Sequence, residues 1–232
     1  MKLYGLFGKG SGKLGSSVFA ISSGEQIVRE YNPVVENPNT PAQVEQRAKF
    51  KLLSQIAATL ASIIVIAKQG LISSRNRFIG LNIGKATYAD DKASINVQNI
   101  DITGGSAAMQ DFEILAEAQG QTPVRLISPA ASDITAVVYA VVGVDANSQL
   151  IVRNSKVVTA PGENRKFDTT LANVPQPAYI FAYGIKGDVA GALAEYGDYE
   201  APEADVIASL IANRSTKAGT LTFTKTVCNV IE

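Results

Sequence analysis

The chain has 232 residues and equal numbers of basic and acidic side chains, 21 of each, so its formal net charge is zero. It contains no histidine and one cysteine, which excludes a Ser-His-Asp or Cys-His centre within one chain, an internal disulfide and a cysteine-rich zinc site. Hydrophobic residues make up 46% of the chain and charged residues 18%, which favours a folded chain with a core over intrinsic disorder.

The charges are distributed unevenly along the chain. Residues 1–88 hold 11 Lys/Arg and 4 Asp/Glu, a balance of +7, whereas residues 89–232 hold 10 and 17, a balance of −7. This asymmetry predicts an electrostatically polarised molecule, whose basic half can meet an acidic surface, nucleic acid or the acidic half of a neighbour. A chance distribution of solvated surface charge is the alternative.

No segment is typical of a membrane span or a secretory signal. The most apolar run, Ile56 to Ala67, has 12 residues, and a span needs about 20. The first residues carry Lys2, Lys9 and Lys13 but no long apolar stretch. We therefore expect a buried helix, no membrane partner, and synthesis in a cytoplasm.

The glycine-rich opening, GKGSGKLG at residues 8–15, invites a test for phosphate binding. A P-loop needs Ser or Thr after its lysine, and Leu14 follows Lys13 here. The glycine spacing also fits a dinucleotide fingerprint, but that motif must open a helix, and a hairpin pattern follows instead. The segment therefore predicts no cofactor and indicates a flexible or docking segment.

Two alternating segments, Ser16 to Ile21 and Gln26 to Tyr31, predict a β-hairpin, because Gly24 suits the positive φ of a tight turn. Prolines at positions 33, 38 and 41 then predict an extended arm. Val34 and Val35 in this arm need a surface to lie on, either in their own domain or on a neighbouring subunit.

A long helix is predicted next, from Pro41 to about Lys68. Thr40 is a good N-cap, Pro41 suits the first helical position, and apolar residues recur every four positions from Val44 to Ile64. Residues 71–90 fit either a second short helix or a loop, and residues 95–103 alternate like a strand.

From about residue 111 the chain consists of short β segments separated by turn signals. They are FEILAEA, VRLISPA, ITAVVYAVVGVD, QLIVRN, KVVTAP, RKFDTTL, AYIFAYGIKG and GTLTFTKTVCNVI. This spacing predicts an immunoglobulin-like β-sandwich with residues 130–144 and 178–185 as central strands, and residues 201–215 as a short helix. The predicted fold class is α+β: an N-terminal β-hairpin, extended arm and long helix in residues 1–105, followed by the sandwich in residues 106–232.

Residues 8–53 resemble a known family. The order G-K-L-G, V-R and N-P-x-T-x-A-Q-x-x-Q-R-x-K-F is similar to an uncharacterised protein family of Bacteroidota and their phages, and most of all to structural proteins of crAss-like bacteriophages. The matching residues are Gly12, Lys13, Leu14, Gly15, Val28, Arg29, Asn37, Pro38, Thr40, Ala42, Gln43, Gln46, Arg47, Lys49 and Phe50. In that family such an N-terminal part precedes an immunoglobulin-like domain.

The resemblance implies a virion protein, most like an auxiliary capsid protein that binds the major capsid protein and other copies of itself. A component of the tail or portal ring is the variant that it leaves open. Together with the basic, extended character of the front segment, it suggests these docking residues: Lys9, Lys13, Arg29, Val34, Val35, Asn37 and Arg47.

Three other classes of function stay open on the residues alone. An immunoglobulin-like sandwich can serve as a carbohydrate- or surface-binding module. An enzyme or metal site would have to use the clustered acids Asp188, Glu195, Asp198, Glu200, Glu203 and Asp205, for which solvated loop charge is the ordinary explanation. We expect neither catalysis nor a bound metal, and the few lysines before the hairpin argue against a nucleic-acid partner.

Overall fold

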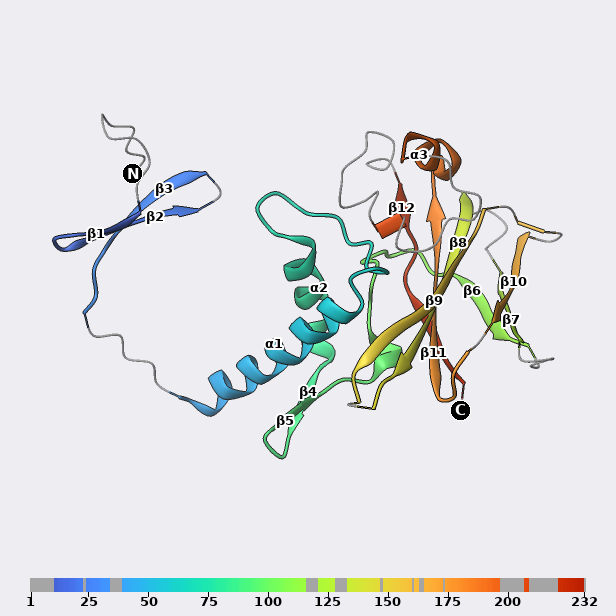
Figure 1. Ribbon diagram of the computed structural model, residues 1–232, viewed down its shortest axis with the longest axis horizontal. Helices are drawn as coiled ribbons and strands as arrows, with labels where there is room; N and C mark the ends of the chain where they lie inside the picture. Colours follow the sequence, from blue (N-terminus) through green and yellow to red (C-terminus); the bar gives the residue numbers. More distant parts are fainter. Residues whose placement is uncertain are drawn as a thin grey trace. The chain divides into compact units, whose positions relative to one another are not determined.

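The computed structural model describes residues 11–22, 24–33, 39–115, 121–127, 133–146, 148–159, 161–162, 165–172, 174–196, 207–208 and 221–231. The chain divides into two compact units, Met1–Gln43 and Val44–Glu232, and each is treated by itself (Figure 1). Most of the predicted arm, residues 34–38, lies outside the described residues.

The first unit contains a small antiparallel sheet. The predicted hairpin is confirmed as β2, Ser17–Ser22, paired with β3, Glu25–Glu30, around a turn in which Gly24 has a φ of 80°. A third short strand that the sequence pattern did not reveal, β1, Gly12–Leu14, pairs with the other edge of β2. The sheet order is therefore β1-β2-β3.

Helix α1, Pro41–Thr59, starts as predicted, with the Gln43 amide 3.4 Å from the Thr40 hydroxyl. Its predicted continuation to Lys68 is wrong. The run from Ile63 to Ile66 is β-branched and favours extended backbone over helix. Within it, the Val65 amide donates to the Ile102 carbonyl at 3.1 Å, so this piece bonds to a distant segment instead of to the preceding helical turn.

The segment between α1 and the β body holds short elements. Of the two alternatives for residues 71–90, the helix is confirmed: α2, Ser74–Asn82, is capped by the Ser73 hydroxyl. The strand predicted at residues 95–103 is wrong, because the Asn96 side chain accepts from the Gln98 amide and starts a single 3-10 turn. The remaining elements here are the 3-10 turns η1, Ile83–Lys85, and η2, Val97–Asn99, and the hairpin strands β4, Thr87–Ala89, and β5, Lys92–Ser94.

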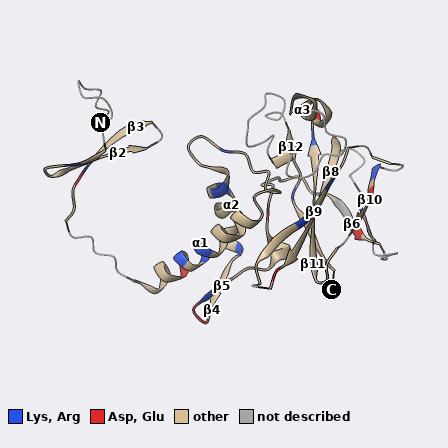
Figure 2. Cartoon of the chain, viewed as in Figure 1, with Lys and Arg blue, Asp and Glu red and all other residues tan. Residues whose placement is uncertain are grey.

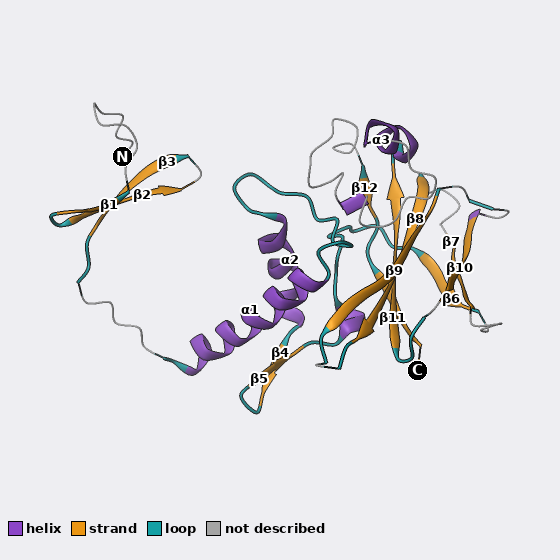
Figure 3. Ribbon diagram, in the orientation of Figure 1, coloured by secondary structure: helices purple, strands orange, loops and turns teal. Residues whose placement is uncertain are grey.

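Two antiparallel sheets form most of the second unit (Figure 3). The larger has the order β12-β11-β8-β9, with β13 also paired to β11; the smaller has the order β10-β7-β6. QLIVRN and KVVTAP, expected as separate strands, form one continuous strand, β9. The bounds are β6, Gln110–Ile114; β7, Gln121–Ile127; β8, Ile134–Val144; β9, Leu150–Val158; β10, Lys166–Ala172; β11, Ala178–Lys186; β12, Thr222–Phe223; and β13, Val227–Ile231.

Strands β8 and β11 are central, as predicted, and their near-continuous apolar sequences follow from burial on both faces. On one face Tyr139 and Ile180 pack with Leu126 and Phe167 of the smaller sheet. On the other face, alternate residues of β8 and β11 pack in a second core with α1, α2 and the segment that follows them. The larger sheet is therefore the middle layer of this unit.

The last elements complete this second core. Helix α3, Val189–Tyr196, was not predicted, and it contributes Val189 and Ala192. Of the helix predicted at residues 201–215, the described pair Ile207 and Ala208 is helical and buried, and the rest lies outside the described residues.

The fold class is a mixed α+β arrangement, mostly β-strands in several antiparallel sheets, with few helices. The second core joins residues from both sides of position 105, where the sequence suggested a domain boundary. That boundary stays a prediction, whereas the two compact units meet after Gln43.

Candidate docking surfaces

The β1-β2-β3 sheet carries apolar side chains on both of its faces. The strand register places Leu14, Phe19, Ile21 and Val28 on one face, and Val18, Ala20 and Ile27 on the other. None of the residues described in this sheet is buried, and the Leu14 side chain is 73% exposed. A small sheet without a core is marginally stable in water, so these faces favour contact with another surface.

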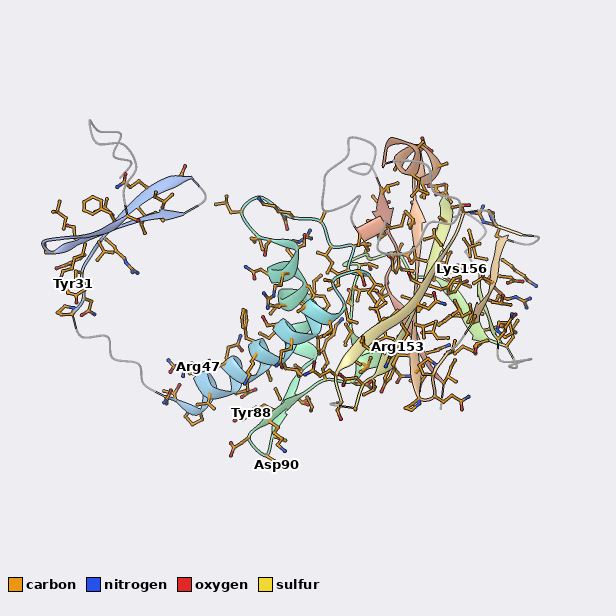
Figure 4. The ribbon with its side chains drawn as sticks, viewed as in Figure 1. Tyr31, Arg47, Tyr88, Asp90, Arg153 and Lys156 are labelled. Carbon is orange, nitrogen blue, oxygen red and sulfur yellow. The ribbon has the colours of Figure 1, made fainter. Side chains whose placement is uncertain are left out.

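Two of the predicted docking residues lie side by side in this sheet. The register pairs Val18 of β2 with Lys13 on one edge and with Arg29 on the other, so the three residues form one row. The Lys13 ammonium also lies 3.5 Å from the centre of the Tyr31 ring, which is a cation–π contact. Figure 4 labels Tyr31 at the end of this sheet. A row of two cations around an apolar side chain is suited to an acidic protein surface.

The other predicted docking residues do not join this row. Lys9, Val34, Val35 and Asn37 lie outside the described residues. Arg47 lies on the exposed side of α1, in the second unit. The sequence motif therefore contributes to two separate units rather than to one site.

Arginines at the start of α2 attach it to α1. One Arg75 Nη atom donates to the Ser54 carbonyl at 3.1 Å and to its hydroxyl at 2.5 Å. Arg77 donates at 2.5 Å to the carbonyl of Ala67, which follows α1. Each of these two arginines therefore holds a backbone carbonyl.

One hollow of about 640 Å³ lies where η1, η2 and the C-terminal strand meet. Its charged lining residues are Lys85, Asp101 and Lys225. Burial lowers the pKa of Lys85, with Asp101 opposing and Lys225 adding to that shift. The Asp101 carboxylate is already occupied, since one of its oxygens accepts from the Thr103 and Gly104 amides and from the Thr226 hydroxyl. This wall is organised by structural hydrogen bonds.

The single cysteine also lines this hollow. Burial raises the pKa of the Cys228 thiol to about 12, so the thiol is protonated at neutral pH and is a poor nucleophile. Cys228 is partly buried and packs against the second core as a small apolar side chain.

A second hollow, of about 510 Å³, separates α1 from β5 and from the turn between β8 and β9. Its lining includes Leu52, Ile56, Ile95 and Tyr179, and contains no charged residue. It offers apolar surface and a few amides, and no His, Asp, Glu, Lys or Cys side chain lines it.

The acidic residues near the C-terminus contribute little to a site within the described chain. An oxygen of Asp188 accepts from the Gly191 amide at 2.9 Å and caps α3. Asp198 to Asp205 lie outside the described residues. Among the residues that the structure describes, no group of three or more Cys, Asp or Glu side chains could hold a metal ion, and no helix there is long and apolar enough to cross a membrane.

Comparison of this chain with protein-family models, with curated proteins and with solved structures finds no match.

Proposed function

We propose that this chain is a structural protein of bacteriophage particles, an auxiliary capsid protein that binds the major capsid protein and other copies of itself. The observation that carries the proposal is the β1-β2-β3 sheet, whose described residues are apolar on both faces and are not buried. Six residues of this part, Gly12 to Gly15 with Val28 and Arg29, belong to the stretch that resembles crAss-like phage proteins.

The role proposed for this sheet is attachment rather than catalysis. Its apolar faces gain buried area on a partner, and the Lys13–Val18–Arg29 row gives that contact a preference for an acidic surface. In a shell, many weak contacts of this kind add up, because each copy is held at several points. The proposed location is the virion, after synthesis in the host cytoplasm.

We infer further that the two larger sheets form an immunoglobulin-like sandwich. Counting from β6, the second strand lies between the first and the fifth, and the third lies between the fourth and the sixth, with the last strand added to the sixth. This Greek-key order, with a core between the two sheets, supports the inference. The helices on the outer face of the larger sheet are an addition to such a sandwich.

Washed particles of a phage that encodes this chain provide the first test. Mass spectrometry should find the chain in copy numbers comparable with those of the major capsid protein. A copy number limited to one ring would instead assign it to the tail or portal, and its absence from washed particles would refute the virion role.

The second test examines the sheet itself by co-sedimentation of the full chain with empty capsids. Leu14→Ser with Ile21→Ser should abolish binding, and Lys13→Ser with Arg29→Ser should weaken it in a salt-dependent way. Arg153→Ser with Lys156→Ser is the matched control for the second pair, because both residues are exposed on β9 (Figure 4). Equal binding by all variants would show that the sheet is not the attachment point.

A further inference from the structure

The hollow where η1, η2 and β13 meet has no part in the proposed attachment, and its two lysines come from distant parts of the chain. Lys85 ends η1, and Lys225 lies between β12 and β13. Burial lowers the pKa of Lys85, Asp101 opposes that shift, and the charge of Lys225 adds to it. The two ammonium groups are therefore close enough to repel each other.

Neither ammonium group is paired with an acid within the described part of the chain. Lys85 donates at 3.3 Å to the Asn82 amide oxygen, a neutral acceptor that also accepts from the Asp101 amide. The Lys225 ammonium has no hydrogen bond or ion pair with any described residue. Both lysines are exposed, so a ligand can reach them. Two neighbouring cations without a bonded counter-charge favour a bound anion.

Asp101, the acid that lines the hollow with these lysines, limits the charge of that anion. One Asp101 oxygen accepts from two backbone amides and from the Thr226 hydroxyl, and no described residue donates to its other oxygen. Two lysines and one aspartate sum to a charge of +1, which a carboxylate neutralises and a phosphate, at about −1.5 to −2, exceeds. Figure 2 shows Lys and Arg spread over several elements of the second unit. A small anion fits that distribution better than an extended polyanion, which needs a continuous basic stripe.

The rest of the lining suits the uncharged part of such a ligand. A volume of about 640 Å³ is within the range of small-molecule sites and far exceeds a single carboxylate group. The exposed side chains of Gln98 and Asn99 offer amide donors and acceptors, and Val227 offers apolar surface. The unbonded Asp101 oxygen is a further acceptor. This combination matches the hydroxyl and C–H groups of a sugar ring.

We propose that this hollow binds a sugar acid, a hydroxyl-bearing molecule with one carboxylate, such as a uronic acid residue of an acidic saccharide. The carboxylate of the ligand accepts from the Lys85 and Lys225 ammonium groups. Its hydroxyls bond the amides of Gln98 and Asn99 and donate to Asp101. The site uses no residue of the β1-β2-β3 sheet, so it stands or falls independently of the attachment role.

The first measurement is an NMR titration of the ¹⁵N-labelled full chain with sodium glucuronate. Amide signals of residues 98–101 and 225–229 should shift, with a Kd of about 0.1–1 mM, as expected for a small ligand in an open site. Glucose, which lacks the charge, and acetate, which lacks the hydroxyls, should each bind about tenfold more weakly. No shift at about 10 mM glucuronate, or tighter binding of acetate or inorganic phosphate, would overturn the proposal.

Two variants test the two halves of the site. Lys85→Gln with Lys225→Gln should weaken the binding of both glucuronate and acetate by about tenfold or more, because it removes both positive charges. Asn99→Ala should weaken glucuronate binding about threefold and leave acetate binding unchanged, since its amide contacts only hydroxyls. The second variant keeps the test valid if the lysine pair proves necessary for folding.

The matched control is Lys92→Gln with Lys156→Gln, which makes the same residue changes at exposed positions of β5 and β9, outside the hollow. Its affinity for glucuronate should stay within about twofold of the parent chain. Equal weakening by this control and by the Lys85 and Lys225 variant would mean that glucuronate responds only to net charge, and would refute the site.

Discussion

The β1-β2-β3 sheet and the β8–β11 pair have similar strand sequences but opposite surroundings. Phe19 lies on a sheet in which no described residue is buried, and Phe181 of β11 is fully buried. The difference comes from what covers the strands: the larger sheet has a second sheet on one face and α1, α2 and α3 on the other. A strand pattern therefore predicts pairing, but burial depends on neighbours that the strand does not specify.

The largest expected effect tests this comparison directly. Phe181→Ala should lower the free energy of unfolding by about 3–5 kcal/mol, because it leaves a cavity in a packed core. Phe19→Ala, the same change on the first unit's sheet, should alter it by less than about 0.5 kcal/mol. Urea unfolding of both variants measures the two values.

The test depends on the difference between the stability losses of these two variants. A large loss for Phe19→Ala would mean that the small sheet is held by the body of its own chain, and the proposed attachment role would lose its physical basis. If Phe181→Ala folded too poorly to measure, Val138→Ala in β8 would provide a smaller cavity in the same core.

Loss of a buried polar side chain in α2 should give a second, smaller loss of stability. Asn82 is fully buried; its amide donates to the Phe78 and Asp101 carbonyls at 2.9 Å, and its oxygen accepts from the Asp101 amide at 2.8 Å. Asn82→Ala should cost about 2 kcal/mol, because it leaves buried backbone groups without partners. Asn154→Ala, which removes one long 3.5 Å bond, is the matched control and should cost much less.

The sequence predicted what depends on local chemistry. The Thr40 cap, the turn at Gly24 and the long apolar run of β8 are signals within a few residues, and each element begins near its expected place. Gly105 is the last residue of the region that the sequence assigned to the first domain. At Gly105 a Cβ atom would meet the backbone carbonyl oxygens of Phe223 and Thr224, a reason for glycine that only the folded chain reveals.

The features that the sequence did not predict depend on contacts between distant segments. The end of α1 is set by the bond from Val65 to Ile102, and the helical layer over β8 and β11 follows from no single stretch. The same holds for the candidate site: Lys13 and Arg29 become neighbours only through the register of three strands, one of them three residues long. Arg47 was selected by a motif, and the structure places it in the other unit, apart from Lys13 and Arg29.

A third prediction separates two buried tyrosines of the larger sheet. The Tyr139 hydroxyl donates to the Phe167 carbonyl of the facing sheet, whereas the Tyr183 hydroxyl has no partner among the described residues. Burial raises the pKa of both phenols, so both stay protonated. Tyr139→Phe should therefore cost about 1 kcal/mol, and Tyr183→Phe should be neutral or stabilising. Thermal unfolding of the pair checks this, and equal losses would contradict it.

The smallest expected change in stability concerns an ion pair on the exposed face of the β10-β7-β6 sheet. Arg125 bonds Asp168 with two contacts of 2.8 and 2.9 Å, and Glu113 lies 3.9 Å away on the third strand. The bond to Arg125 holds the pKa of Asp168 below its usual range. Because the folded-state pKa is lowered, the stabilisation is present above the unfolded value of about 3.9 and is lost as pH falls through the lower folded-state value.

Asp168→Asn should therefore lower the free energy of unfolding by about 0.5 kcal/mol at pH 7, a value already reduced for the partial exposure of the pair. The gap between the parent chain and the variant should close as pH falls below about 4, and should narrow in high salt. A gap that persisted unchanged at low pH would assign the effect to packing of the side chain rather than to its charge. The Asp168 side chain would then stabilise the fold through packing, as the buried side chains of β8 and β11 do, although it lies on an exposed face.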